Sequence, residues 1–177
     1  LLFLGFLTSY KGMDLLIKGF ALMDKNKYYF LIASGKHPKY LNDKNYIEKT
    51  YNYYKNLASN LLGSKNHRWD GFVAESDLIY YYSVADLVIF PYTIALSSSG
   101  PMALSIGSQT GFVASKVFSH FIKDQKLLFN LNAKSLKKCV ENYMKNKYQN
   151  QIQISKMANQ LLWEKIAKLH IKLYNSL

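Results

Sequence analysis

Residues 86–101 read DLVIFPYTIALSSSGP, and they contain the structural unit on which the fold depends. The largely apolar run at residues 86–92 is typical of a strand buried on both faces. Pro91 ends it, because proline cannot donate a hydrogen bond to a sheet. Serines and a glycine close the loop that follows, and Pro101 is favoured in the first turn of a helix. The stretch therefore predicts a strand, a loop and a helix, in that order.

The same unit recurs on both sides of this stretch. We predict further strands at residues 3–7, 28–34, 67–72, 112–115 and 126–130, and helices at residues 13–23, 43–62, 76–83 and 101–108. Ser76 is expected to cap the third of these helices. Apolar strands that alternate with helices favour a parallel sheet covered on both faces. The expected fold class is α/β, a Rossmann-like three-layer sandwich with a six-stranded parallel sheet and C-terminal helices.

From residue 135 onward apolar residues recur at helical spacing, which predicts two C-terminal helices. Trp163 in the last helix is expected to face inward, and so is Tyr53 in the helix at residues 43–62. The composition does not change along the chain. A single domain over residues 1–177 is the simplest organisation.

Charge and cysteine content limit the classes of function. The chain has 177 residues and a formal net charge of +12, and Arg68 is the single arginine among its 23 basic residues. Lysines spread along a chain are more typical of a solvated surface than of a nucleic-acid site, although attraction to an anionic membrane stays open. A nucleic-acid-binding domain is an alternative that only the tyrosine-rich residues 46–54 support. The one cysteine, Cys139, excludes an intramolecular disulfide, and we expect it to be a buried apolar residue in a reducing compartment.

Two loops have chemistry suited to a ligand. In a parallel sheet, ligands bind outside the carboxyl ends of the strands. The loop at residues 5–12 places Lys11 at the start of a helix, and the loop at residues 91–101 would present hydroxyl and N–H groups to an anion. A solvated lysine and a simple helix cap are the alternatives for these two features. The residues proposed for the second loop are Ser97, Ser98, Ser99 and Gly100.

The common fingerprints of nucleotide, zinc and hydrolase sites do not occur in the sequence. Its four histidines are dispersed, so no metal site is expected. Four carboxylates occur around the third expected strand and the helix after it, where they would act as general bases or, more simply, as helix caps. They are Asp70, Glu75, Asp77 and Asp86.

In this order, the motifs resemble the C-terminal half of group 1 (family 4) glycosyltransferases of the GT-B fold. Residues 5–12 are similar to the family's glycine loop that ends in Lys-Gly, and residues 31–35 (LIASG) are similar to its strand that ends in Ala-Gly. Residues 71–75 (GFVAE) and 85–91 (ADLVIFP) resemble two further family motifs. The serine-rich loop and the strand FVAS at residues 112–115 resemble a subset of the family.

The resemblance implies roles for particular residues. Lys11 and Gly12, together with Ser97, Ser98, Ser99 and Gly100, would bind the diphosphate of a nucleotide-sugar donor. Gly35, Val73 and Glu75 would lie near the base and ribose. No catalytic residue is assigned, and neither a cofactor nor a metal is expected.

Several positions depart from the family pattern. No arginine occurs at residues 6–9, shortly after Gly5, where many members of the family have one, and no glutamate occurs between Glu75 and Glu141, where the family has a pair. Leu104 stands at the second of these glutamates, and Gln109 and Gly111 replace a glycine and a proline. These differences favour an alternative function, that of a degenerate GT-B-like domain that binds without turnover.

The sequence therefore predicts the donor-binding half of a glycosyltransferase. It would transfer a hexose from a nucleoside diphosphate sugar to a saccharide or lipid-linked acceptor, with retention. An N-terminal acceptor domain is absent from this chain, so the chain alone should not catalyse. The expected location is cytoplasmic, at a membrane surface if the acceptor is lipid-linked, and no nucleic-acid partner is expected.

Overall fold

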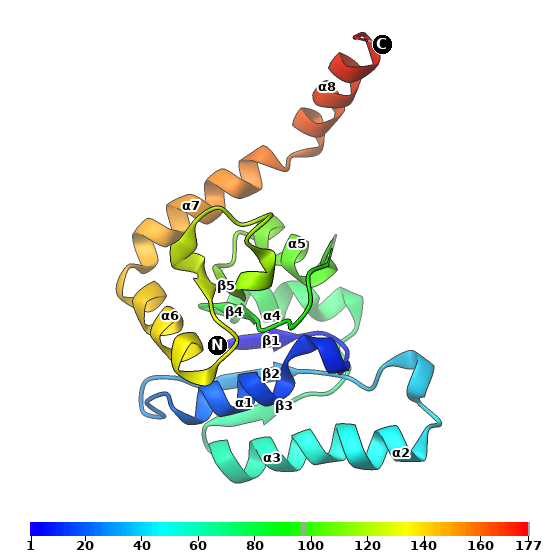
Figure 1. The fold of residues 1–177 in the computed structure, drawn as a ribbon, viewed down its shortest axis with the longest axis vertical. Coiled ribbons are helices and arrows are strands. Elements are labelled where there is room, and N and C mark those ends of the chain that lie inside the picture. Colours follow the sequence, from blue (N-terminus) through cyan, green and yellow to red (C-terminus); the bar gives the residue numbers. More distant parts are fainter. Residues whose placement is uncertain (97, 177) are drawn as a thin grey trace.

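Six parallel strands form one sheet in the computed structural model, which describes residues 1–96 and 98–176. The strands are β1 (Leu2–Leu4), β2 (Phe30–Ala33), β3 (His67–Trp69), β4 (Val88–Phe90), β5 (Phe112–Ser115) and β6 (Leu128–Phe129). Their order in the sheet is β3-β2-β1-β4-β5-β6 (Figure 1). Leu2 lies in register with Leu31 on one side and with Val88 on the other. The predicted fold class is confirmed, although most strands are shorter than the sequence pattern suggests.

Helices cover both faces of the sheet. In Figure 1, α1 (Met13–Ala21) lies in front of the strands, and α4 (Leu78–Val84) and α5 (Gly100–Gly107) lie behind them. α1 packs against α3 (Tyr53–Leu62) and α6 (Ala133–Lys145), while α5 packs against α7 (Lys147–Gln160). Short helical turns complete the chain: η1 (Ser9–Lys11), η2 (Pro38–Tyr40), η4 (Glu75–Asp77), η5 (Lys116–Phe118) and η6 (Gln125–Leu127).

The predicted helix at residues 43–62 is present but not uniform. It consists of α2 (Lys44–Tyr46), a π-helical turn over Ile47–Asn52, and α3. Asp43 caps its start, since the side chain accepts a hydrogen bond from the backbone N–H of Tyr46 at 3.0 Å. Tyr53, expected inside, is 52% exposed. Ser76 does not cap α4, because Asp77 is the residue before this helix, and the Ser76 hydroxyl donates to the Asp77 carboxylate.

Three helices, not two, form the C-terminal region. The additional boundary is at Leu161 and Leu162, where the backbone leaves the helical conformation after α7. The third helix, α8 (Trp163–Tyr174), extends away from the rest of the molecule (Figure 1) and contains no buried residue. Trp163 is 84% exposed, so the prediction that it faces inward is wrong. Helical spacing identifies an apolar face but does not show what covers it.

The core is continuous from strand to helix, and Cys139 belongs to it as predicted. Burial raises the pKa of its thiol to about 12, which keeps it protonated at neutral pH.

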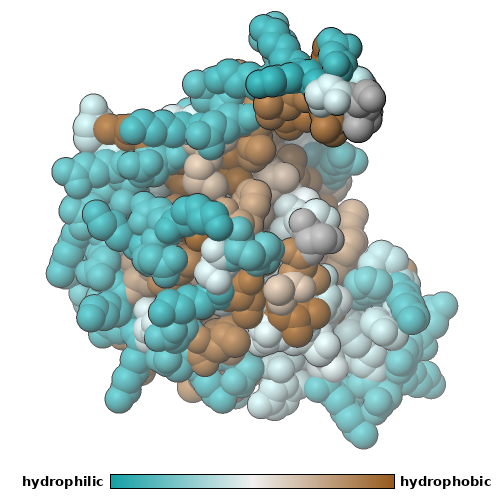
Figure 2. Space-filling view, turned by 45° about the horizontal axis from the view of Figure 1, so that its top comes forward, coloured by the Kyte–Doolittle hydropathy of each residue, from teal (hydrophilic) through white to brown (hydrophobic). Residues whose placement is uncertain are grey.

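In Figure 2, apolar surface gathers toward the middle of the face in view, with hydrophilic side chains around it. Within the described ranges, no helix combines the length and the apolar character needed to cross a membrane.

Candidate functional site

The loops that follow β1 and β4 meet where the direction of the strand order reverses, and in open α/β sheets this is where ligands bind. The backbone carbonyl of Tyr10 accepts two hydrogen bonds from Thr93, one from the backbone N–H at 2.8 Å and one from the hydroxyl at 3.2 Å. These bonds hold the two loops together.

Gly12 brings the start of α1 against the β4 loop. Its φ of 67° lies in the left-handed region, which favours glycine. A Cβ at this position would come within 1.9 Å of the carbonyl oxygen of Pro91, so only glycine fits. Gly12 therefore has a structural role at this junction.

Lys11 is a buried cation at the junction of the two loops. Its side chain is only 7% exposed, and its ammonium lies 5.0 Å from the centre of the Tyr92 ring. The ammonium also lies against Gly5, where an added Cβ would be 2.3 Å from Nζ. Burial lowers the pKa of Lys11, and within the described part of the chain no carboxylate forms an ion pair with it. A desolvated cation in this position favours an anionic ligand.

The serine segment differs from its prediction. Ser97 lies outside the described residues. The Ser99 hydroxyl caps α5, because it accepts the backbone N–H of Met102 at 3.4 Å. Pro101 has no N–H, and the N–H of Ala103 donates to the carbonyl of Ser99. The first turn therefore offers an anion at most the N–H of Gly100, rather than the several free N–H groups expected from the sequence.

A cavity of about 400 Å³ lies beside these loops and brings together residues from five separate parts of the chain. Five predicted site residues line it, and they are Lys11, Gly35, Val73, Glu75 and Gly100. Ser98 and Ser99 instead line a neighbouring apolar cavity of about 390 Å³, which shares Gly100 with the first. The predicted diphosphate and base residues thus meet at one place, apart from the serines and Gly12.

The cavity lining also includes Phe6, Phe72 and Leu104, to which the sequence assigned no role in the site. Phe6 and Phe72 stack with their ring centres 5.9 Å apart, and Leu104 is 46% exposed on the cavity wall. The resemblance of the stretch Gly71-Phe72-Val73 to a family motif could have indicated that Phe72 lies at the site. Leu104 places an apolar side chain where the resembled family has a glutamate.

The four carboxylates do not form one cluster. Asp70 accepts hydrogen bonds from Arg68 and from the Tyr81 hydroxyl, each at 2.6 Å, and Asp86 pairs with Lys147. Burial opposes ionisation of Asp70, but these hydrogen bonds outweigh it and lower the pKa of the carboxyl group. Glu75 alone among the four lines the candidate cavity.

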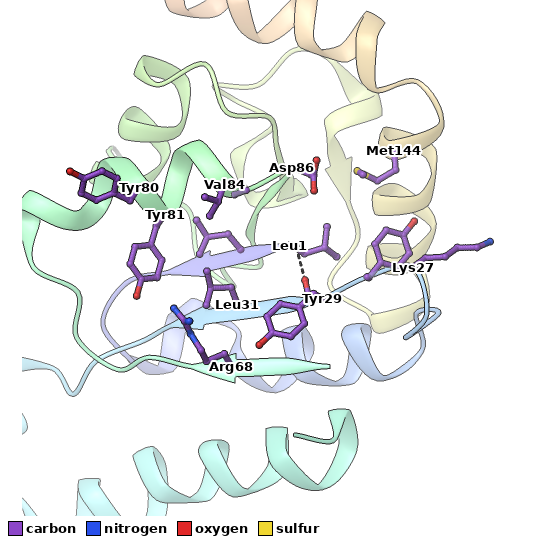
Figure 3. Close-up of a pocket in the computed structure, with 13 residues that line it drawn as sticks. Leu1, Lys27, Tyr29, Leu31, Arg68, Tyr80, Tyr81, Val84, Asp86 and Met144 are labelled. Atoms are coloured by element: carbon purple, nitrogen blue, oxygen red, sulfur yellow. Dashed lines mark hydrogen bonds between the residues drawn. The ribbon is translucent and has the colours of Figure 1, made fainter. Parts of the chain in front are cut away.

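A larger cavity, of about 610 Å³, lies at the opposite edge of the sheet (Figure 3). Leu1, Tyr29 and Asp86, which come just before β1, β2 and β4, line it. The terminal amino group of Leu1 donates to the carbonyl of Tyr29 there at 2.7 Å. This cavity is at the amino ends of the strands, so size alone does not make it the better candidate.

Across residues 1–96 and 98–176, no group of three or more histidine, cysteine, aspartate or glutamate residues is placed to hold a metal ion.

A family model described as glycosyl transferases group 1 matches residues 1–161. The chain belongs to this family. No match was found among curated proteins.

Solved structures of similar fold include several glycosyltransferases. The catalytic domain of cholesterol-alpha-glucosyltransferase from Helicobacter pylori is 23% identical, with a TM-score of 0.71 over 90% of this chain and 94% of that chain. Sucrose-phosphate synthase from Thermosynechococcus elongatus is 19% identical, with a TM-score of 0.76, and covers 99% of this chain. HepE of Anabaena, solved with UDP, is 12% identical, with a TM-score of 0.77, and also covers 99% of this chain.

The lengths of these structures differ from that of this chain. The match covers only 44% of the sucrose-phosphate synthase chain and 48% of the HepE chain. The chain of this group 1 family member thus spans about half the length of those two relatives.

Proposed function

We propose that this chain is the donor-binding part of a glycosyltransferase that transfers a hexose from a nucleoside diphosphate sugar to a saccharide or lipid-linked acceptor, with retention. The observation that carries the proposal is Lys11, a buried cation without a carboxylate partner in the described residues, which lines the cavity at the reversal of strand order. The HepE structure with UDP supports a nucleoside diphosphate as the ligand class.

In this function, Lys11 would bind the diphosphate and stabilise the negative charge that develops on it when the sugar leaves. The N–H of Gly100 would donate to the same phosphate group. The phosphate oxygens would accept these hydrogen bonds directly, so the proposed function includes no metal ion. Glu75 would lie toward the ribose, since it comes from the loop after β3.

A second domain of the same enzyme would close the site and bring the acceptor. The partial coverage of sucrose-phosphate synthase and HepE supports this, and so does the uncovered apolar face of α8, which includes Trp163 and Leu169. The chain alone would therefore bind the donor without transferring the sugar. If the acceptor is lipid-linked, the net charge of +12 would favour an anionic membrane surface.

A degenerate binding domain is the second candidate function. Leu104 supports it, because an apolar side chain lines the cavity where the resembled family has a glutamate. A degenerate domain would bind a partner or ligand without turnover, and it need bind neither UDP nor GDP. Sugar transfer by the chain joined to its second domain would support the enzyme, whereas the absence of any transfer would support the degenerate domain.

Titration calorimetry with UDP and GDP tests the site. Whichever of the two nucleotides binds, Lys11→Ala should lower its affinity by about 10- to 100-fold, the usual effect of a lost charge-assisted contact. Lys18→Ala is the matched control, since Lys18 is an exposed lysine on α1 that pairs with Asp14. Equal affinity in the native chain and Lys11→Ala would contradict this role of Lys11.

A further inference from the structure

Tyr46, at the end of α2, connects two of the loops that form the candidate cavity. Its hydroxyl donates a hydrogen bond to the backbone carbonyl of Leu7 at 2.7 Å and accepts one from the backbone N–H of His37 at 3.1 Å. Leu7 belongs to the loop after β1, which contributes Lys11 to the cavity. His37 belongs to the loop after β2, which contributes Gly35. A single hydroxyl group therefore ties the two loops together.

The backbone from Leu7 to Lys11 extends this connection to the buried ammonium. The N–H of Leu7 donates to the carbonyl of Gly35 at 3.0 Å, and the Leu7 side chain is fully buried. The N–H of Lys11 donates to the carbonyl of Thr8 at 3.1 Å, so one turn of backbone joins Lys11 to the fixed position of Leu7. A shift of the Leu7 carbonyl would therefore also move Lys11.

The π-helical turn at Ile47–Asn52 explains how this part of the helix reaches the loops. In a regular α-helix, residues five apart point about 140° away from each other. A π turn is wider, because each residue bonds to the fifth one along, and it brings Tyr46 and Tyr51 closer to one side of the helix. Tyr51 also contacts the sheet, since its hydroxyl accepts a hydrogen bond from Nε1 of Trp69 at 3.3 Å. Turns of this kind occur frequently at functional sites.

The Tyr46 hydroxyl keeps its proton for the bond to Leu7. Burial raises the pKa of this group, while the hydrogen bond from His37 acts in the opposite direction. The ring of Tyr46 packs against that of Tyr40, with 5.0 Å between the ring centres. Phenylalanine at this position would keep the ring contact and remove only the two hydrogen bonds.

We propose that Tyr46 is a positioning residue, which holds the loop after β1 in the conformation that places Lys11 at the candidate cavity. This inference rests on the proposed donor-binding function and adds a residue that acts on the donor diphosphate only through Lys11. Holding the loop in advance favours binding, because the ligand then does not have to order it.

Hydrogen exchange of the 177-residue chain, followed by mass spectrometry, measures whether Tyr46 holds the loop. Tyr46→Phe leaves the carbonyl of Leu7 and the N–H of His37 without this partner, so the amides of residues 5–12 should exchange at least about 5-fold faster. The amides of α6 are the internal reference and should keep their native exchange rates. Tyr51→Phe is the matched control, since it removes a hydroxyl from the same helix that bonds to Trp69 and not to this loop.

Titration calorimetry with inorganic pyrophosphate measures whether the held loop serves the ligand. If the loop of Tyr46→Phe is out of position for between about half and nine-tenths of the time, pyrophosphate affinity falls about 2- to 10-fold, in proportion to the population that can bind. Tyr51→Phe should bind pyrophosphate within about twofold of the native chain.

Three results would overturn the inference. They are native exchange rates at residues 5–12 in Tyr46→Phe, an equal acceleration in α6, which would show a general loss of stability, and an unchanged affinity for pyrophosphate. If the native chain binds neither pyrophosphate nor UDP, the proposed function itself fails. The exchange rates, which need no ligand, then decide by themselves whether Tyr46 holds the loop.

Discussion

Lys11 combines burial with positive charge, and this combination should lower the stability of the fold. Its pKa in the folded chain is below the ordinary 10.5, because burial disfavours the charged form. Between these two pKa values the unfolded chain binds more protons than the folded chain, so the free energy of unfolding rises with pH in that window. Below the window, the folded protein keeps a charge that its surroundings disfavour.

Lys11→Met should therefore stabilise the protein while it weakens diphosphate binding. At pH 7 we expect the free energy of unfolding to rise by about 0.5–2 kcal/mol, as for other substitutions that relieve strain at functional sites. Urea denaturation measures this gain, which should shrink as the pH increases through the lowered pKa of Lys11. Lys18→Met, at an exposed lysine, should show no comparable gain. A loss of stability in Lys11→Met would mean that packing of the lysine's aliphatic chain stabilises the fold more than its buried charge destabilises it.

Sequence patterns could identify part of the site at the level of single residues. Lys11, Gly35 and Glu75 follow different strands, and the rule that carboxyl ends of parallel strands share one edge predicts that they meet. Phe6 and Phe72 could not be recognised in the same way. An apolar residue in a sequence of this composition is expected in the core, and only the fold shows that Phe72 is exposed.

At the scale of elements, α5 depends on its cap. Ser99→Ala removes the acceptor for the N–H of Met102 and should lower the free energy of unfolding by about 1 kcal/mol. UDP affinity should stay within twofold, because the Ser99 hydroxyl is already used within the chain. Ser98→Ala, at the exposed neighbouring serine, should leave stability unchanged. A large loss of UDP affinity in Ser99→Ala would show that this hydroxyl contacts the ligand after all.

The strands were easier to predict than the helix boundaries. The runs YYFLIAS and FVAS are apolar up to their final serine, and such runs are typical of central parallel strands. The break at Leu161 and Leu162 has no comparable signal, because leucine is a good helix former and the flanking apolar residues keep helical spacing. The predicted cap at Ser76 is absent for a local reason, since Ser76 lies inside the turn η4 and Asp77 is the residue before α4.

At the scale of the whole molecule, α8 contributes little to the packed domain. None of its residues is buried, whereas Ile154 in α7 is fully buried. Deleting residues 163–177 should therefore change the melting temperature by less than about 2 °C, which corresponds to at most about 1 kcal/mol for a chain of this size.

Ile154→Ala is the contrasting variant, and it should lower the free energy of unfolding by about 2–5 kcal/mol, as expected for a buried isoleucine. Thermal unfolding followed by circular dichroism measures both changes. If the deletion destabilised the chain as strongly as Ile154→Ala, α8 would have to pack against the domain in solution.

The central place of β1 in the sheet has a consequence for how the protein is made. β1 pairs with β2 and with β4, and the partner of Leu2 on the β4 side is Val88. During synthesis, β1 leaves the ribosome before β4 and must therefore wait for the residues up to Val88 before its second edge is paired. Such distant pairings slow folding, and an unpaired apolar edge promotes association between nascent chains. A chaperone that holds nascent chains should therefore increase the yield of this protein most while β1 still lacks β4.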